Sequence, residues 1–335
     1  MTRVPVNALR ALALKALARA GVPDTHAQIQ ADLLIEGELR ALPSHGLLRL
    51  RRVIERIHAG LAVPDTKGAH RWAARNYLRV DGERGLGPVV AMAALDAIMA
   101  RARDDGIAIA AIRNANHLGA LAYYAEYAAR QDIVCIGLTI SEALVHPYGG
   151  RKALIGTNPI AIGVPADPAP VILDMATSLV AMGKIYDYAS KSLPIPLGWA
   201  LDKNGDPTTN AEAAKAGAIA PFGGAKGYAL GVAIEVLVAS LTASAIGNDV
   251  KGTLDSIHPS NKGDVFIAIS APQAGPARGI VSAYLDELRQ TDPAEAGKPV
   301  LAPGDRARSS REQFLALGLD IDEKLYEDLQ HMATA

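Results

Sequence analysis

Cysteine is almost absent from this chain, whose 335 residues include only Cys135. One cysteine excludes a disulfide framework and a cluster of thiolate metal ligands built within the chain. Cys135 lies in the apolar run DIVCIGLTI (132–140), and such a run is typical of a buried strand. We therefore expect Cys135 to be a buried strand residue.

The chain also lacks an excess of charge of either sign. It has 34 basic and 35 acidic residues, spread along its length, and a formal net charge of -1. Such a balance gives no electrostatic footprint for nucleic acid or for an anionic membrane surface. We expect the main partner to be a small molecule.

Long uninterrupted apolar runs are rare as well. The one segment long enough to approach the thickness of a bilayer, residues 227–247, carries Glu235 at its middle, which is costly in lipid. We therefore expect a central helix of a soluble core there. Near the N-terminus, Arg10, Lys15 and Arg19 interrupt the apolar pattern that a leader peptide would need, which favours a cytoplasmic protein.

The usual nucleotide-binding and metal-binding fingerprints are missing. GLGPVV (85–90) lacks the third glycine of a dinucleotide-binding turn, and GGAKG (223–227) lacks the spacing of a phosphate loop. The eight histidines show no HExxH spacing, which disfavours a metal hydrolase. Any nucleotide must be held in another way.

What the sequence does contain is a helical first part followed by alternating strands and helices. With 335 residues and 50% hydrophobic content, it predicts one large domain or two interlocked ones of α/β or α+β type. Helices are expected at 5–20, 23–42, 44–60, 87–105, from 226 and at 278–290, with a last one after a basic turn at 303–311. Strands are expected at 77–82, 107–112, 133–140, 159–165, 170–174 and 264–270, and a long ordered loop at about 190–225.

Two motifs carry histidines in positions suited to chemistry. In PSHGLLRL (43–50), Ser44 can cap a helix on which His45 and Arg49 stand four residues apart on one face, as a proton donor beside a carboxylate clamp. A surface His and Arg on an ordinary capped helix is the alternative. In NANHLGA (114–120), His117 lies at a strand-to-helix junction, where functional loops gather. Its alternative is a structural histidine in a turn.

Three further motifs suit a nucleotide less specifically. Thr157 and Asn158 precede Pro159 in a turn, and Asp174 ends a strand in LDMATS. Lys226 stands among glycines at a helix start, which suits a phosphate. Each of these features is equally compatible with local structure alone, as a turn, an N-cap or a loop-to-helix junction.

Together and in this order, SHGLLR, NANHLGA, GTNPIAIGVP, LDMATS, IPLGWALDKNGDPTT and PFGGAKGYAL resemble the type 2 malate/L-lactate dehydrogenase family over residues 5 to 320. The resemblance implies a homodimeric oxidoreductase that uses NADP or NAD and acts on a small carboxylate. It also implies an α/β fold with a non-Rossmann mixed-sheet cofactor domain (76–277), like that of L-sulfolactate dehydrogenase. A helical subdomain (1–75) would pack with the C-terminal helices (278–335).

The family also implies roles for individual residues. Those matching catalytic positions are His117, His45 and Ser44, and neither histidine is ranked as the principal proton carrier. Those matching substrate-binding positions are Arg49, Thr157 and Lys184. Those matching cofactor-binding positions are Ser141, Asp174, Met175, Ala176, Lys226, Gly227, Gly119 and Asn158.

Two departures bear on the substrate. Val53 stands where relatives often have a tyrosine, and Lys184 stands where the reductases of cyclic imino acids have an aspartate. The second weakens the imino-acid alternative and leaves 2-oxo and 2-hydroxy acids of sulfolactate, malate or lactate type as the main prediction. A keto sugar acid reductase and a non-catalytic nucleotide-binding protein stay open. GDRARSSR (304–311) could supply basic residues for the 2'-phosphate of NADP, and a solvated turn is the alternative.

Overall fold

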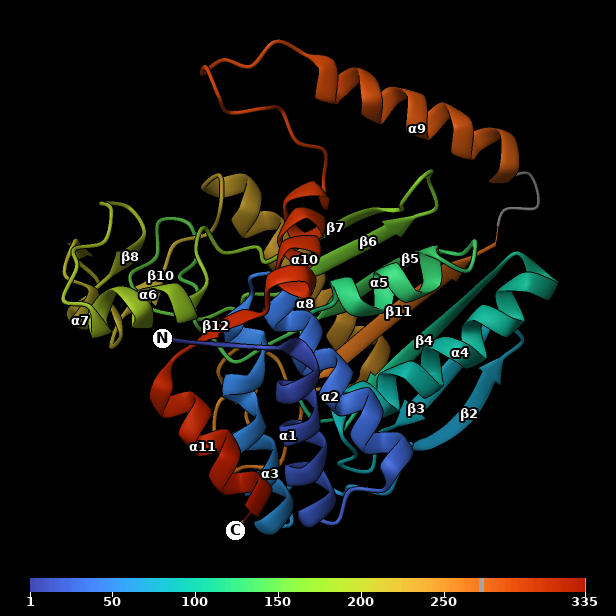
Figure 1. The fold of residues 1–335 in the computed structure, drawn as a ribbon, viewed down its shortest axis with the longest axis horizontal. Helices are drawn as coiled ribbons and strands as arrows, with labels where there is room; N and C mark the ends of the chain where they lie inside the picture. The colour runs from blue at the N-terminus through green and yellow to red at the C-terminus, as the bar shows by residue number, and fades with distance from the viewer. Residues whose placement is uncertain (271–273, 335) are drawn as a thin grey trace.

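The protein is built around one mixed sheet with helices on both faces, to which a helical bundle (bottom in Figure 1) and a small lobe (left) are attached. The computed structural model describes residues 1–270 and 274–334. In spatial order the seven strands of the sheet are β2 (Ala69–Ala74), β3 (Tyr77–Asp81), β4 (Ile107–Arg113), β11 (Gly263–Ile269), β5 (Val134–Thr139), β6 (Ile160–Val164) and β7 (Val171–Met175). Only β3 and β4 are parallel among its adjacent pairs. The non-Rossmann, mixed-sheet α/β class is confirmed.

The two faces of this sheet have separate cores because successive side chains of a strand point to opposite faces. Phe266 of β11 packs with α4 (Gly87–Asp105) and α5 (Ala122–Ala129), whereas its neighbour Val265 packs under α8 (Ala225–Thr242). Cys135 of β5 is fully buried, as expected.

The two chain ends meet in the helical bundle. It contains α1 (Val6–Arg19), α2 (Asp24–Leu39), α3 (Leu50–His58) and α11 (Glu323–Thr334), and the antiparallel pair β1 (Thr2–Val4) and β12 (Leu319–Ile321) joins the ends. Leu9, Leu17, Leu34 and Leu329 share its core. The C-terminal part therefore stabilises the helices that begin the chain.

The other C-terminal helices lie in two different places. Helix α10 (Asp305–Leu317) contacts α2, and the Arg311 guanidinium donates to Glu36 at 3.0 Å. Helix α9 (Ala274–Gln290) forms an outer arm whose Leu285 packs on residues near the β6–β7 hairpin (Figure 1). The expected domain boundary at residue 75 stays a prediction.

Three expectations about elements were wrong. Residues 43–49 form two 3-10 turns, η1 (Pro43–His45) and η2 (Leu47–Arg49), before α3 begins, so no single helix starts at Ser44. The basic stretch at 304–311 is the first part of α10 and not a turn. The expected loop at 190–225 contains β8 (Ala200–Leu201), β9 (Pro207–Thr208), α7 (Ala211–Ala214) and β10 (Ala218–Ile219).

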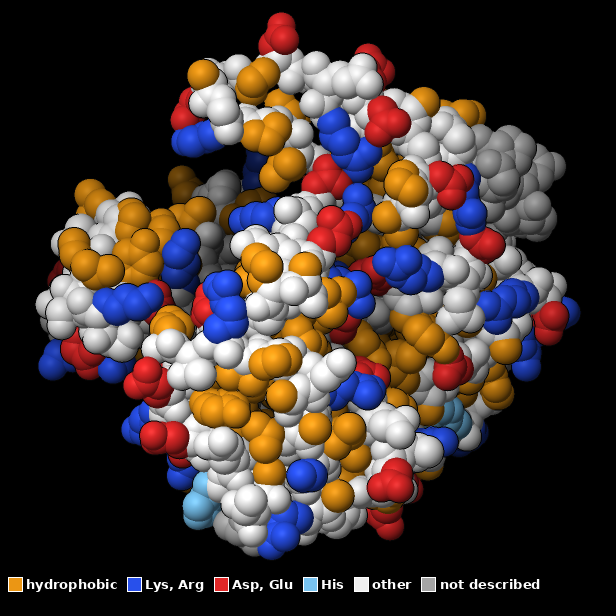
Figure 2. Space-filling model, in the orientation of Figure 1, with side chains coloured by type: hydrophobic (Ala, Val, Ile, Leu, Met, Phe, Trp, Pro, Cys, Tyr) orange, Lys and Arg blue, Asp and Glu red, His pale blue; other side chains and the backbone are white. Residues whose placement is uncertain are grey.

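These short elements and α6 (Met182–Ser190) form the small lobe around a core of its own. On the face that Figure 2 shows, hydrophobic side chains gather on this lobe, while positive and negative side chains are interspersed over the rest. Leu193 and Leu197 of the lobe are exposed.

Helix α8 differs from the expected core helix, because only 33% of it is buried. It has the length and hydropathy of a membrane span, but so do core helices of soluble proteins. Its buried face includes Glu235, whose carboxylate accepts from the backbone N–H groups of Gly156 at 3.1 Å and Gly247 at 2.6 Å. Leu230, Val236 and Leu237 are exposed on the other face. The correction follows from one-sided packing against β11, β4 and β5.

Candidate active site

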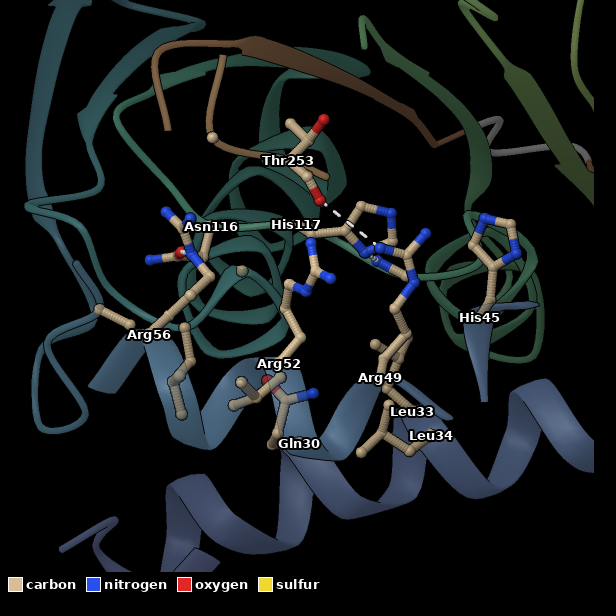
Figure 3. A pocket seen from close by; sticks show the side chains of 16 residues that line it. Gln30, Leu33, Leu34, His45, Arg49, Arg52, Arg56, Asn116, His117 and Thr253 are labelled. Atoms are coloured by element: carbon tan, nitrogen blue, oxygen red, sulfur yellow. Dashed lines mark hydrogen bonds between the residues drawn. The ribbon is translucent and has the colours of Figure 1, made fainter. Parts of the chain in front are cut away.

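A pocket lies where the 3-10 turns and α3 face the loop after β4 and the loop around residue 253. It brings together the predicted site residues His45, Arg49 and His117, from two distant parts of the chain, and the predicted cofactor residue Gly119 also lines it (Figure 3). The other lining residues are Gln30, Leu33, Leu34, Arg52, Val53, Arg56, Ala62, Leu86, Gly87, Asn116, Gly119, Gly252 and Thr253.

A hydrogen bond to Glu38 of α2 fixes the pair of turns that carries Ser44 and His45. The Leu47 N–H donates to Glu38 Oε1 at 2.7 Å. A Cβ at position 46 would lie 2.2 Å from that same oxygen, so only glycine allows so close an approach. Burial raises the pKa of Glu38 to about 7. The proximity of His45 and Arg49 thus comes from two tight turns and not from a helix face.

His45 is a neutral imidazole with one nitrogen available. Its Nδ1 lies 3.1 Å from Ser44 Oγ, and either atom can donate. Burial, followed by the charge of Arg49, lowers its pKa to about 4. The Ser44 hydroxyl can rotate to accept from Nδ1 or to donate to it, so it accommodates either tautomer of the ring, and Nε2 can serve as a donor or as an acceptor.

His117 is neutral too, but its proton has a fixed position. Its Nδ1 accepts the backbone N–H of Gly119 at 3.0 Å, which leaves the proton of the neutral ring on Nε2. Burial, followed by Arg49, holds its pKa well below the usual range. Gly119 has φ of +75°, and a Cβ there would lie 2.2 Å from Leu33, so this contact requires glycine. The rings of His45 and His117 have centroids 5.7 Å apart.

Arg49 anchors the turn and faces the pocket. Its Nε donates to the Ser44 carbonyl at 2.8 Å and its Nη1 lies 3.5 Å from the Thr253 carbonyl. Burial lowers its pKa, but from so high a value that the group stays charged. The outer edge of the guanidinium can therefore bind an anion beside both histidines.

Sequence reasoning missed Arg52, Arg56 and Asn116. Arg56 Nε donates to Asn116 Oδ1 at 2.8 Å, and its Nη1 donates to the Asp255 carbonyl at 2.7 Å, which fixes the loop after Thr253 over the pocket. A signal was present, since positions 49, 52 and 56 follow the i, i+3, i+7 spacing of one helical face.

The predicted cofactor residues Ser141 and Asn158 and the predicted substrate residue Thr157 lie together at the ends of β5 and β6. Ser141 Oγ is 3.2 Å from Thr157 Oγ1 and accepts the Thr157 N–H at 3.0 Å. Asn158 is fully buried, and its amide donates to the Gly231 carbonyl at 3.1 Å and to Glu235. Its Oδ1 has no partner in the described structure.

The start of α8 joins this group through Thr177, whose N–H donates to the Thr157 carbonyl at 2.8 Å and whose carbonyl accepts the Phe222 N–H at 3.1 Å. Helix α8 has no side-chain cap, and Gly224 before it has φ of 62°. Lys226 is exposed in the first turn. An uncapped helix N-terminus with a lysine suits a phosphate group.

The other predicted cofactor residues, Asp174, Met175, Ala176 and Gly227, have surroundings that give them a role in the local structure. One oxygen of Asp174 accepts the Ala122 N–H at 2.7 Å and so caps α5, while burial raises the pKa of Asp174 to about 6. Met175 ends β7 and Ala176 follows it. A Cβ at Gly227 would lie 1.9 Å from the Phe222 carbonyl oxygen.

Lys184 is not among the residues that line the pocket. Its ammonium lies 5.2 Å from the centroid of the Trp199 ring. The adjacent Gly183 nevertheless lies against Ser44, since a Cβ there would be 2.9 Å from Ser44 Cβ. Among the residues described, no group of three His, Cys, Asp or Glu could hold a metal ion.

Comparison with known proteins gives matches along nearly the whole chain. A family model described as malate/L-lactate dehydrogenase matches residues 4–330. The chain is 36% identical over 327 residues to a malate/(S)-sulfolactate dehydrogenase of Methanothermus fervidus, covering 97% of this chain and 95% of the relative. Two solved structures superpose closely. A dehydrogenase from Sinorhizobium meliloti has a TM-score of 0.95 and 52% identity, covering 99% of this chain and 98% of the other. A sulfolactate dehydrogenase from Methanocaldococcus jannaschii has a TM-score of 0.92 and 35% identity, covering 99% and 96%.

Proposed function

This chain belongs to the malate/L-lactate dehydrogenase family, and from that premise we propose that its pocket interconverts a 2-oxo acid and a 2-hydroxy acid with NADP or NAD. The observation that carries the proposal is the convergence of two neutral imidazoles and a guanidinium in one pocket. Hydride transfer to a carbonyl needs a donor at its oxygen, a proton source and a fixed substrate orientation. The three side chains can meet these needs.

Arg49 is proposed to orient the substrate by binding its carboxylate. A guanidinium presents parallel N–H donors that match the two oxygens of a carboxylate. Arg49 Nε donates to the Ser44 carbonyl and Nη1 lies 3.5 Å from the Thr253 carbonyl, so the remaining N–H groups of the two terminal nitrogens are the ones proposed to bind the substrate. The carboxylate would then hold the adjacent carbon 2 between the imidazoles.

The two histidines are proposed to have different roles. His117 donates its Nε2–H to the substrate oxygen and polarises the carbonyl, because Gly119 fixes its tautomer. A second proton on His117 would break the Gly119 contact, so His45, whose partner is a rotatable hydroxyl, carries the proton. A hydrogen bond spans about 2.8 Å, so rings with centroids 5.7 Å apart can reach one oxygen.

The second group of residues is proposed to hold the cofactor. Lys226 and the N–H groups at the start of α8 fit its phosphates, and the Ser141 hydroxyl, 3.2 Å from that of Thr157, fits its polar edges. Asp174, Met175, Ala176, Gly227 and Asn158 stay in the proposed set as residues that shape this region. Gly119 stays in the set as a residue of the histidine pocket, where the nicotinamide would have to meet the substrate. The nicotinamide supplies or accepts the hydride when it is bound. Thr157 and Lys184 remain proposed substrate contacts.

We further propose that the chain works in the cytoplasm as a homodimer, acting on a small carboxylate, with no nucleic acid or membrane partner. The dimer proposal is supported by the exposed apolar face of α8, which carries Leu230, Val236 and Leu237, and Val236 lines a shallow surface hollow together with Leu154 and Ile246. Exposed apolar stripes of this kind commonly mark protein interfaces.

The test is an absorbance assay of NADH and NADPH oxidation with a panel of 2-oxo acids, a cyclic imino acid and neutral ketones. We expect turnover to be fastest with a 2-oxo acid. Faster turnover of the cyclic imino acid would place the chain with the imino-acid reductases. Cofactor binding without turnover of any compound would indicate a non-catalytic nucleotide-binding protein and contradict the proposal.

A further inference from the structure

The pocket holds three guanidinium groups, of which the proposed reaction uses only that of Arg49. Arg52 lies between Arg49 and Arg56 along α3, and its side chain rises with theirs towards His117 and Thr253 (Figure 3). Arg56 donates hydrogen bonds to Asn116 and to the carbonyls of Asp255 and His258, in the loop after Thr253 that covers the pocket. Arg49 donates a hydrogen bond to the Ser44 carbonyl. In the described part of the chain, no hydrogen bond or ion pair of Arg52 is found.

The nearby carboxylates are already engaged. Glu142 Oε1 accepts the N–H groups of Thr253 at 2.8 Å and Leu254 at 2.9 Å. Asp255 Oδ1 accepts the N–H groups of Ile257 at 2.9 Å and His258 at 2.8 Å. These contacts hold the loop around Thr253 in place, and in the described part of the chain neither carboxylate forms an ion pair with Arg52.

Arg52 is half-buried beside two other cations, and its charge lowers the pKa of both Arg49 and Arg56. A partly desolvated charge without a counter-ion is unfavourable, and a site of one sign concentrates ligands of the opposite sign. An anion beside Arg52 would relieve the repulsion among the three guanidinium groups.

We propose that Arg52 is a specificity-determining residue that binds a second anionic group, a carboxylate or sulfonate on carbon 3 of the substrate. This inference rests on the proposed function, since it assigns the first carboxylate to Arg49. The preferred substrates are then dianionic 2-oxo acids. Val53, which follows Arg52 and lines the same pocket, is apolar and offers no group that could bind the second anion.

The spacing of the two arginines fits such a substrate. Residues three apart on a helix are neighbours, with Cβ atoms about 5–6 Å apart. The end carbons of a four-carbon diacid lie roughly 4 Å apart, given C–C bonds of about 1.5 Å. Two converging guanidinium groups can therefore bind both ends of one small molecule.

The kinetic test compares oxaloacetate with pyruvate in the wild type and in Arg52→Gln. We expect the wild type to prefer oxaloacetate, and the ratio of the two kcat/KM values to fall by roughly 30-fold or more in the variant, the scale of one charged hydrogen bond. Arg52→Lys should keep part of the preference. The matched control is Arg51→Gln, since Arg51 is exposed and pairs with Glu55 at 3.2 Å, and its ratio should stay that of the wild type.

A preference of the wild type for pyruvate, or equal losses for both substrates, would overturn the inference. A raised KM for the cofactor with an unchanged substrate ratio would also overturn it, because Arg52 would then serve a cofactor phosphate.

A binding measurement separates this inference from the proposed function. Succinate should raise the melting temperature of the enzyme–cofactor complex more than butyrate does, and Arg52→Gln should abolish the difference. If no 2-oxo acid is turned over, the proposed function fails, while the succinate result still decides whether Arg52 binds a second anion. Equal effects of succinate and butyrate on the wild type would contradict the inference.

Discussion

His45 and His117 have different hydrogen-bond partners at Nδ1, and the partner determines the role that we propose for each ring. His117 Nδ1 faces a backbone N–H that cannot turn, whereas His45 Nδ1 faces a hydroxyl that can. Gln at position 117 keeps an N–H donor, but Gln at position 45 cannot take up a proton. We therefore expect His45→Gln to lower kcat by about 100-fold or more and His117→Gln to lower it less. The measurement is steady-state kinetics, with the exposed His331→Gln as control. A larger loss in His117→Gln would reverse the assignment.

The pH dependence of the reaction follows from the same residues. Oxidation of the hydroxy acid needs His45 without its proton, and burial beside Arg49 lowers its pKa to about 4. Protonation therefore inhibits only as the pH falls towards that value, and kcat/KM for oxidation should stay flat down to roughly one pH unit above it. A pH–rate profile checks this. An acid limb near the ordinary histidine pKa, about 6.5, would show that the pocket does not desolvate the base.

The sequence could predict these residues but not their surroundings. The motifs identified His45, Arg49 and His117, and the expected closeness of His45 to Arg49 was right although the predicted helix face was wrong. Arg52 was missed because a charged residue on a helix is usually solvated. Only the packing of α3 against the loop around Thr253 encloses it.

At the scale of elements, the pair of 3-10 turns depends on Glu38 of α2. Burial raises its pKa from the ordinary 4.5 to about 7, so the folded state binds more protons than the unfolded state between those values. Its contribution to stability is fully present below pH 4.5 and is lost as the pH rises through 7. Glu38→Gln removes this ionisation. The free energy of unfolding of the wild type, relative to Glu38→Gln, should fall by up to about 3 kcal/mol over this interval.

Denaturant unfolding at several pH values measures this difference. Glu312→Gln is the control, since Glu312 is exposed on α10 and its substitution should leave the pH dependence unchanged. A constant difference between Glu38→Gln and the wild type would show that Glu38 stays charged in the fold.

An element could be predicted from the sequence when residues within or next to it stabilise it, and could not when its stabilising contacts come from distant segments. Helix α4, with Pro88 in its first turn and Gly106 at a φ of 85° after its end, was predicted correctly. The stretch at 304–311 was taken for a basic turn, but Asp305 accepts the Ala302 N–H at 2.9 Å and Arg289 Nε at 2.8 Å. Arg308 and Arg311 donate to Pro170 and Glu36, contacts that give them structural roles. Tertiary partners from distant segments therefore contribute to a helix there, and a reading of the local sequence could not include them.

At the scale of the whole molecule, α8 shows why hydropathy alone could not place a helix. A core helix and an interface helix are equally apolar, and a chain read alone does not distinguish them. If the exposed face is the dimer interface, Leu237→Glu should give monomers in light scattering after size-exclusion chromatography. Leu317→Glu, on α10, is the control for an exposed leucine elsewhere. A Leu237→Glu variant that remains dimeric would exclude this face from the interface.

The account as a whole depends on Arg49 binding a carboxylate next to the reacting carbon. The most direct measurement is kcat/KM for the best 2-oxo acid and for its neutral amide, in the wild type, in Arg49→Lys and in the control Arg51→Lys. Lysine keeps the charge but loses both the planar fork and the bond to the Ser44 carbonyl. We expect the acid to lose roughly 10-fold or more in Arg49→Lys, as for a charged hydrogen bond, and the amide to be a poor substrate that responds little. An undiminished kcat/KM for the acid in Arg49→Lys, or an amide that the wild type uses better than the acid, would contradict the account.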